Sequence, residues 1–172
     1  AKENGNWYTD QKTIQGIILL LFCWNFASPI TRRLTNEQII TLLLENCEIL
    51  TELEEVSIVD EFNDEIKKKI IKVFGSFRIV LGQTGASKAL SLLNPKLFIM
   101  WDTKIREELR REGLISGVYN GERPEYYLKY LIDMKDIIRR NSLVERLGEG
   151  NNIAKKIDEF HYAKIVSANL NQ

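Results

Sequence analysis

The chain of 172 residues carries 24 Lys and Arg against 24 Asp and Glu, with 44% apolar and 28% charged residues. This length suits one well-packed domain over residues 1–172, and the zero net charge excludes binding to nucleic acid through overall charge alone. Two cysteines and one histidine exclude an iron–sulfur cluster held by four thiolates and argue against a structural zinc site. We therefore expect no metal and no cofactor.

The helices are taken in chain order, because apolar residues recur at helical spacing and strand signals are poor. The first helix is expected from residue 9 or 10 to residue 27. Its apolar run at residues 17–24 is too short to span a bilayer, and the preceding segment mixes acidic with basic residues. A central buried helix is the first interpretation of this run, and the core of a signal peptide is the alternative.

Capping and helix-breaking residues delimit the helices that follow. These helices are expected over residues 36–50, 60 or 63 to 80, 86–93, 102–112, 124–141 and 153–170. Thr35 or Asn36 is the expected N-cap of the first of them, and Asp102 is the expected N-cap of the helix over 102–112. Gly82 and Gly85 are predicted to break the chain before residue 86. The predicted fold class is all-α, as a compact multi-helix domain.

Charge is unevenly distributed along these elements. Residues 1–64 carry 4 basic and 11 acidic side chains, whereas residues 65–112 carry 11 basic and 5 acidic ones. The basic excess coincides with the glycine-containing segment at residues 81–89. It has two interpretations, a solvated helix face or a surface that contacts phosphate. The basic residues nearest one another are Lys67, Lys68, Lys69 and Lys72.

The cysteines and the histidine indicate where the protein works. Cys23 and Cys47 lie in apolar helical patterns without Cys-x-x-Cys spacing, so they are expected to be buried thiols. His161 has no cysteine near it and is expected to be a packed or surface residue of the last helix. These features predict a cytoplasmic, intracellular protein without a membrane partner, and we expect a monomer.

The most informative stretch is Leu81-Gly82-Gln83-Thr84-Gly85-Ala86-Ser87-Lys88-Ala89, followed by Trp101-Asp102-Thr103-Lys104-Ile105. It predicts a glycine turn between two helices, a short loop, and an aspartate that opens another helix. Backbone N–H groups at the start of a helix lack intrahelical partners, so the turn offers a site for an anion. Lys88 and Asp102 add a nucleophile and a carboxylate close to that site.

These elements resemble, in their order, the helix-hairpin-helix DNA glycosylases of the endonuclease III type, over roughly residues 62–114. In that family a glycine-rich hairpin precedes an Asp-Thr element, and the segment ends near Arg-Leu-Gly-Leu. Here that end is Arg110-Arg111-Glu112-Gly113-Leu114. The resemblance implies a helix-hairpin-helix motif at about 70–93 and an Asp-capped helix at 102–112. It also implies two helical lobes that flank a cleft, in a member without an iron–sulfur cluster.

The resemblance implies roles for individual residues. Asp102 would stabilise the positive charge that builds on the sugar as an N-glycosidic bond breaks. Lys88 would attack the sugar carbon in a strand-cleaving AP-lyase step. The family's lysine lies two residues after the last hairpin glycine, a position that Ser87 holds here, so Lys88 is one residue later. The DNA backbone would be contacted by Gly82, Gln83, Thr84, Gly85 and Ser87.

A base that leaves the duplex needs a pocket with aromatic walls. Trp24 and Trp101 are expected to line it, and Asn25 is expected to fill the vacated stack. Each site residue also has a structural interpretation: Asp102 as a helix cap, Lys88 as a surface residue, and the two tryptophans as core.

The sequence therefore predicts a DNA N-glycosylase of base excision repair, which removes a damaged or mismatched base from double-stranded DNA. The alternative is a non-enzymatic helix-hairpin-helix module that binds nucleic acid or a protein partner. A third interpretation is a helical domain with no nucleic-acid role, in which the glycines form a tight turn between helices.

Overall fold

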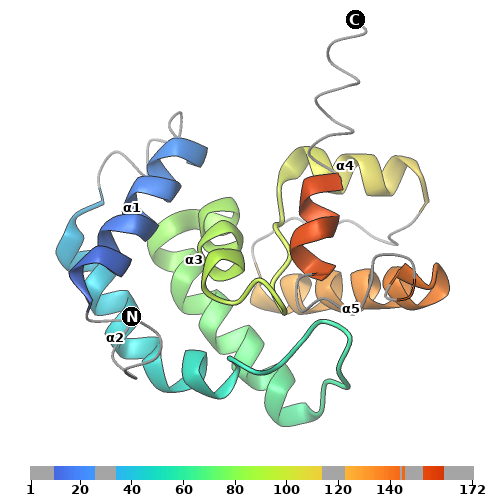
Figure 1. Cartoon of the computed structure of the whole chain (residues 1–172), viewed down its shortest axis with the longest axis horizontal. Helices are drawn as coiled ribbons and strands as arrows, with labels where there is room; N and C mark the ends of the chain where they lie inside the picture. Colours follow the sequence, from blue (N-terminus) through green and yellow to red (C-terminus); the bar gives the residue numbers. More distant parts are fainter. Residues whose placement is uncertain (1–9, 26–33, 114–122, 144, 146–152, 161–172) are drawn as a thin grey trace, which may run out of the picture.

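A computed structural model describes residues 10–25, 34–113, 123–143, 145 and 153–160 (Figure 1). Over these residues the fold is all-helical, which confirms the predicted fold class at that level. The elements are α1 (Gln11–Asn25), α2 (Asn36–Glu52), α3 (Asp64–Leu93), α4 (Thr103–Arg111), α5 (Pro124–Arg140) and a last helical segment over 153–160.

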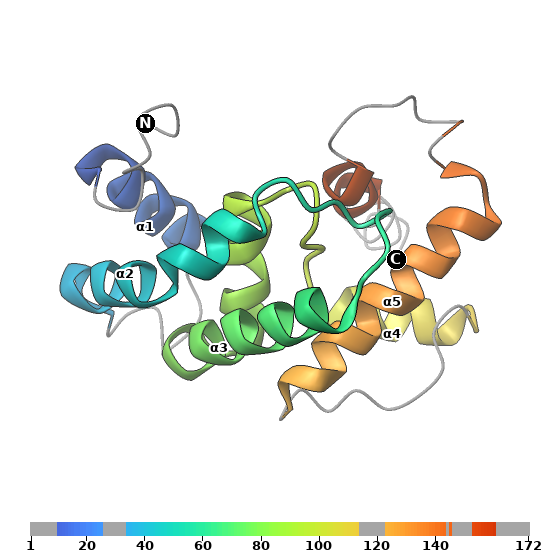
Figure 2. The same cartoon turned by 90° about the horizontal axis from the view of Figure 1, so that it is seen from below.

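Helix α3 is the centre of the fold. It contacts α1 and α2 on one side and α5 on the other. Figures 1 and 2 show α4, α5 and the segment 153–160 together on the side of α3 that faces away from α1 and α2. The site described below therefore lies on the side of α3 that contacts α5.

The helix ends follow from local capping, as predicted. Thr35 caps α2 through a capping box: its hydroxyl accepts from the Gln38 N–H, and the Gln38 side chain accepts from the Thr35 N–H. Asn63 caps α3 by accepting from the Ile66 N–H at 2.8 Å. Pro124 occupies the first turn of α5, where its missing N–H costs nothing. The expected ends at these positions are confirmed.

Gly82 divides α3 into two arms, which we call the first arm (64–81) and the second arm (83–93). Its φ of 70° and ψ of 172° are not helical and lie in a region that is open in practice only to glycine. The prediction that Gly85 also breaks the helix is wrong. Gly85 is buried inside the second arm, because the single residue Gly82 is enough to redirect the chain.

Substitution of Gly82 tests this turn. Gly82→Ala is expected to lower the free energy of unfolding by about 1–3 kcal/mol, because a Cβ is strained at this φ and ψ. Gly16→Ala is the matched control. Gly16 lies within α1, and a Cβ there meets no atom within 4 Å, so this change should instead raise stability by about 0.5–1 kcal/mol. Urea denaturation measures both values, and equal effects at the two sites would contradict the assignment of Gly82 as the turn residue.

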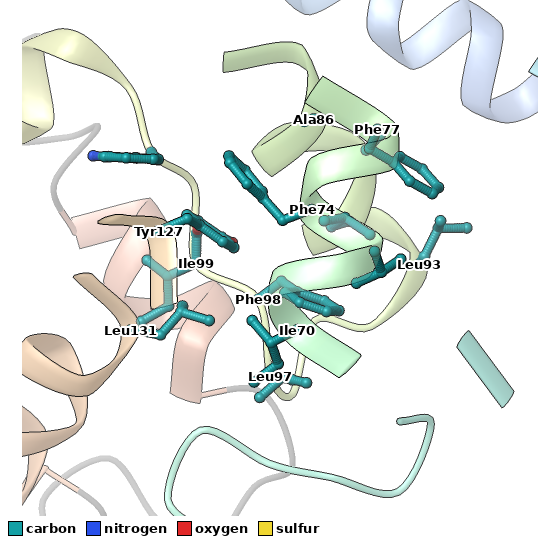
Figure 3. Packing of buried hydrophobic residues seen from close by; sticks show 14 of the residues in the cluster. Ile70, Phe74, Phe77, Ala86, Leu93, Leu97, Phe98, Ile99, Tyr127 and Leu131 are labelled. Atoms are coloured by element: carbon teal, nitrogen blue, oxygen red, sulfur yellow. The ribbon is translucent and has the colours of Figure 1, made fainter. Parts of the chain in front are cut away.

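An aromatic cluster joins α3, α5 and the loop that follows α3 (Figure 3). Phe74 of the first arm stacks on Tyr127 of α5 with ring centroids 4.0 Å apart. Trp101 stacks on Tyr130 at 5.9 Å. All four rings are fully buried, so they fix the position of the loop relative to both helices.

The apolar run of the first helix is buried on one face only, as far as its side chains are described. Ile14 and Ile17 are buried, whereas Leu19 is 64% exposed. The expectation of a central buried helix is therefore wrong for this part of α1, because one face is exposed and α3 rather than α1 lies at the centre of the fold. Among the described helices, none has both the length and the apolar character needed to cross a bilayer.

Candidate active site

The site is built on residues 98–102, which are in neither a helix nor a strand. Within this segment, backbone groups of residues 99–101 are paired with side chains from other elements. The Tyr127 hydroxyl donates to the Ile99 carbonyl at 2.8 Å, and the Tyr130 hydroxyl donates to the Met100 carbonyl at 3.1 Å. Both tyrosines belong to α5. This helix therefore fixes the peptide that leads into α4.

The second arm of α3 holds the same segment from the opposite direction. The Ser87 hydroxyl accepts from the Trp101 N–H at 2.9 Å and donates to the Thr84 carbonyl at 3.0 Å. Ser87 is fully buried. The expectation that Ser87 contacts a DNA phosphate is therefore wrong, since its hydroxyl faces the interior and both its roles are used within the protein.

Asp102 follows this fixed segment and begins α4. Its carboxylate accepts from the Lys104 N–H at 2.8 Å, and its backbone is extended, as an N-cap requires. The predicted cap is confirmed. Asp102 remains half-buried, so capping does not take its carboxylate out of reach.

Lys88 lies on the second arm, six residues after Gly82, and is half-buried. Burial lowers the pKa of its ammonium group, and the negative charge of Asp102 opposes part of that shift. The two side chains therefore lie close enough for their charges to interact. The hydrogen bond from the Trp101 N–H to the Ser87 hydroxyl places the adjoining residues Lys88 and Asp102 in neighbouring parts of the structure. An amine whose pKa is lowered by burial is closer to the neutral form that attacks carbon.

The residues of the turn differ in how accessible they are. Gly82, Gln83 and Thr84 are half-buried, whereas Gly85 is buried. The Gln83 Nε2 atom is buried and has no hydrogen-bond partner among the described residues. The described surface of the turn is therefore formed by residues 82–84, at the start of the second arm, where helix N–H groups favour an anion.

The aromatic residues predicted for the base pocket do not meet at this surface. Trp101 is fully buried among Phe74, Tyr127 and Tyr130, so it has no face on which a base could stack. It is a core residue, which corrects its expected place in the pocket. Arg106 of α4 covers it, with the guanidinium carbon 5.0 Å from the ring centroid. The side chains of Trp24 and Asn25, at the end of α1, lie outside the described residues.

Two basic residues of the first arm form ion pairs within the protein. Lys67 forms an ion pair with Asp64, and Lys69 forms ion pairs with Glu65 and Glu52. This favours the solvated helix face over a phosphate-binding surface for these two lysines. His161 and the side chain of Cys23 lie outside the described residues, and Cys47 is a half-buried free thiol.

Sequence reasoning missed three residues of the site, namely Tyr127, Tyr130 and Asp158. Asp158, in the segment 153–160, accepts from the Met100 N–H with both carboxylate oxygens. Helical spacing with Leu131 and Met134 marks the buried face of α5 on which the two tyrosines lie, but it does not show what their hydroxyls bind. Nothing local marks Asp158, because an aspartate is usually exposed. The described residues contain no group of three or more His, Cys, Asp or Glu side chains that could hold a metal ion.

Comparison of the chain with protein-family models, with curated proteins and with solved structures finds no match. The functional assignment therefore depends on the geometry around Asp102 and Lys88.

Proposed function

We propose that the protein is a DNA N-glycosylase of base excision repair that uses Asp102 as its catalytic carboxylate. The observation that supports this most directly is the 2.9 Å hydrogen bond from the Trp101 N–H to the Ser87 hydroxyl, which brings the chain positions of Asp102 and Lys88 close together after the Gly82 turn. A helix-hairpin-helix motif formed by the two arms of α3 is part of the proposal. The proposal also includes an intracellular location for the protein.

The proposed chemistry needs each member of this pair at its position. Breaking an N-glycosidic bond builds positive charge on the sugar, which a nearby carboxylate stabilises. Asp102 would supply this negatively charged carboxylate, from a backbone that side chains of α3 and α5 hold in place. The N–H groups at the start of the second arm would bind the phosphate beside the target nucleotide, through Gly82, Gln83 and Thr84.

The proposal also concerns the arrangement of the helices around DNA. Helices α1 and α2 would form one lobe and α4 and α5 a second, with α3 between them. The target base would leave the duplex and enter a cleft between these lobes, beside Asp102 and Lys88. With Trp101 in the core, Trp24 is the remaining predicted aromatic wall, with Asn25 beside it. The partner would be double-stranded DNA with a damaged or mismatched base, bound by a monomer.

A panel of duplexes that each carry one lesion or mismatch tests the proposal. Purified protein in excess is incubated with each duplex, and free base and abasic product are measured. Release of one class of base, lost in Asp102→Asn, supports a glycosylase. DNA binding that weakens with salt but releases no base from any duplex would instead support the non-enzymatic helix-hairpin-helix module. Absence of binding at low salt would reject both.

Substitution of Lys88 separates base release from strand cleavage. Lys88→Gln is expected to lower the borohydride-trapped covalent adduct at least about tenfold and to leave base release within about threefold, because only the amine can form a Schiff base. Lys104→Gln is the matched control, since Lys104 is an exposed lysine of α4. Equal trapping by the Lys88→Gln variant and the parent would exclude Lys88 as the nucleophile.

A further inference from the structure

The Met100 N–H depends on one side chain that is far away in the sequence. It donates to the two carboxylate oxygens of Asp158, at 3.0 and 3.2 Å, across a separation of 58 residues. Asp158 is only 4% exposed, and the neighbouring residues Ile99 and Trp101 are fully buried. Met100 itself is half-buried, so loss of the Asp158 oxygens would leave its N–H without this acceptor beside buried neighbours, at a cost in free energy.

We propose that Asp158 is a positioning residue for Asp102: by holding the Met100 amide, it fixes the backbone that places the Asp102 carboxylate beside Lys88. Asp102 lies two residues after Met100, with no helix or strand between them to hold the chain. The effect of Asp158 on catalysis rests on the proposed function. Its effect on the position of Asp102 concerns only the described residues and does not depend on that function.

Burying the Asp158 carboxyl group costs free energy, which suggests that the group has a specific role at this position. Burial raises the pKa of Asp158 to about 8, which the hydrogen bond from Met100 only partly offsets and the charge of Glu159 increases. The charge of Asp158 also raises the pKa values of Tyr127 and Tyr130, so neither tyrosine relieves the cost of its burial. Residues that break the rules of a stable core are concentrated at functional sites. Here the acid provides the acceptor that the Met100 peptide requires.

Two substitutions of nearly equal shape test the inference. Asp158→Asn keeps an oxygen that accepts from the Met100 N–H, whereas Asp158→Leu removes every acceptor. The readout is the pKa of Lys88, measured by NMR titration of ¹³C-methylated lysines, with Lys88→Gln used to assign the signal. This readout follows the position of the Asp102 charge and requires neither DNA nor activity.

The two variants should behave differently. Asp158→Asn should leave the Lys88 pKa unchanged. Asp158→Leu should lower it to the value found in Asp102→Asn, because a displaced carboxylate no longer opposes the effect of burial. In the Asp102→Asn background, Asp158→Leu should cause no further change. An Asp158→Leu variant that folds and keeps the parent Lys88 pKa would overturn the inference.

A second variant decides the matter if Asp158→Leu fails to fold, as judged by circular dichroism. Tyr130→Phe removes the donor to the Met100 carbonyl and keeps the ring that stacks on Trp101. It should lower the Lys88 pKa in the same direction. An unchanged pKa in this variant would reject the inference that the backbone before Asp102 must be held by side chains.

Base release on the best substrate of the lesion panel adds the catalytic readout. Asp158→Leu should lower its single-turnover rate about 10- to 100-fold, and Asp158→Asn should stay within about threefold, since small displacements of catalytic groups cost that much. If the Lys88 pKa responds as expected but no duplex loses a base, the positional inference stands and the proposed function fails. If base is released and the Lys88 pKa does not respond, the proposed function stands and the positional inference fails.

Discussion

Asp102→Asn is expected to lower the single-turnover rate of base release by about 100- to 1,000-fold while leaving the free energy of unfolding within about 0.5 kcal/mol of the parent. The two effects separate because Asp102 has two roles that depend on different properties. Its carboxylate caps α4 by accepting from the Lys104 N–H, and asparagine caps a helix about equally well. Asparagine carries no charge, however, and cannot stabilise positive charge on the sugar.

Asp102→Ala completes this comparison, since alanine removes both the cap and the charge. It should lose base release to the same degree and also lower the free energy of unfolding by about 1 kcal/mol. Glu107→Gln is the matched control, because Glu107 is an exposed acid of the same helix. Stability is measured by urea denaturation and base release on the best substrate of the lesion panel. If Asp102→Asn released base at the parent rate, Asp102 would be a cap and nothing more.

Asp158→Asn is expected to remove most of a steep dependence of stability on pH. The pKa of Asp158 is raised to about 8 in the folded protein, above the ordinary value of 3.8. Between these two pH values the folded state binds a proton that the unfolded chain releases. The contribution of this proton to the free energy of unfolding is therefore fully present below the unfolded pKa. It is lost as the pH rises through the folded pKa. The loss from this group alone is on the order of 4 kcal/mol between pH 5 and pH 8.

Asparagine has the shape of the protonated acid and does not titrate. The free energy of unfolding of Asp158→Asn should therefore exceed that of the parent by an amount that grows with pH over this range. Asp136→Asn is the control, because Asp136 is a half-buried acid of α5 and should change stability little. Urea denaturation at pH 5, 6.5 and 8 gives the comparison. A constant difference between Asp158→Asn and the parent at all three values would show that Asp158 is already ionised at pH 5.

The parts of the fold that depend on neighbouring residues could be predicted from the sequence. Thr35 caps α2, Asp102 caps α4 and Pro124 begins α5, because capping involves residues within one helical turn. The choice between Gly82 and Gly85 could not be made this way. Both glycines allow a turn, and tertiary packing selects the first one.

The helix cap formed by Asp102 could be predicted from the sequence, whereas the burial of the residues around it could not. The direction in which a helical side chain points depends on the rotation of the whole helix. Packing of the second arm turns Ser87 into the core and places Lys88 near Asp102. Trp101 was compatible with a pocket or a core, and the aromatic rings of α3 and α5 decide for the core. Asp158 acts on a peptide 58 residues away, which no local pattern encodes.

The side chains that hold residues 99–101 also determine when the site can form during folding. They lie 14, 28, 30 and 58 residues from the backbone groups they bind. Contacts between residues far apart in sequence form late, because the chain must first close the intervening loops. A partly folded chain in which α1, α2 and α3 have docked would thus contain both Lys88 and Asp102 but not their pairing. If Asp158 positions Asp102 as proposed, the arrangement of Lys88 and Asp102 would be complete only when the segment 153–160 has joined the core.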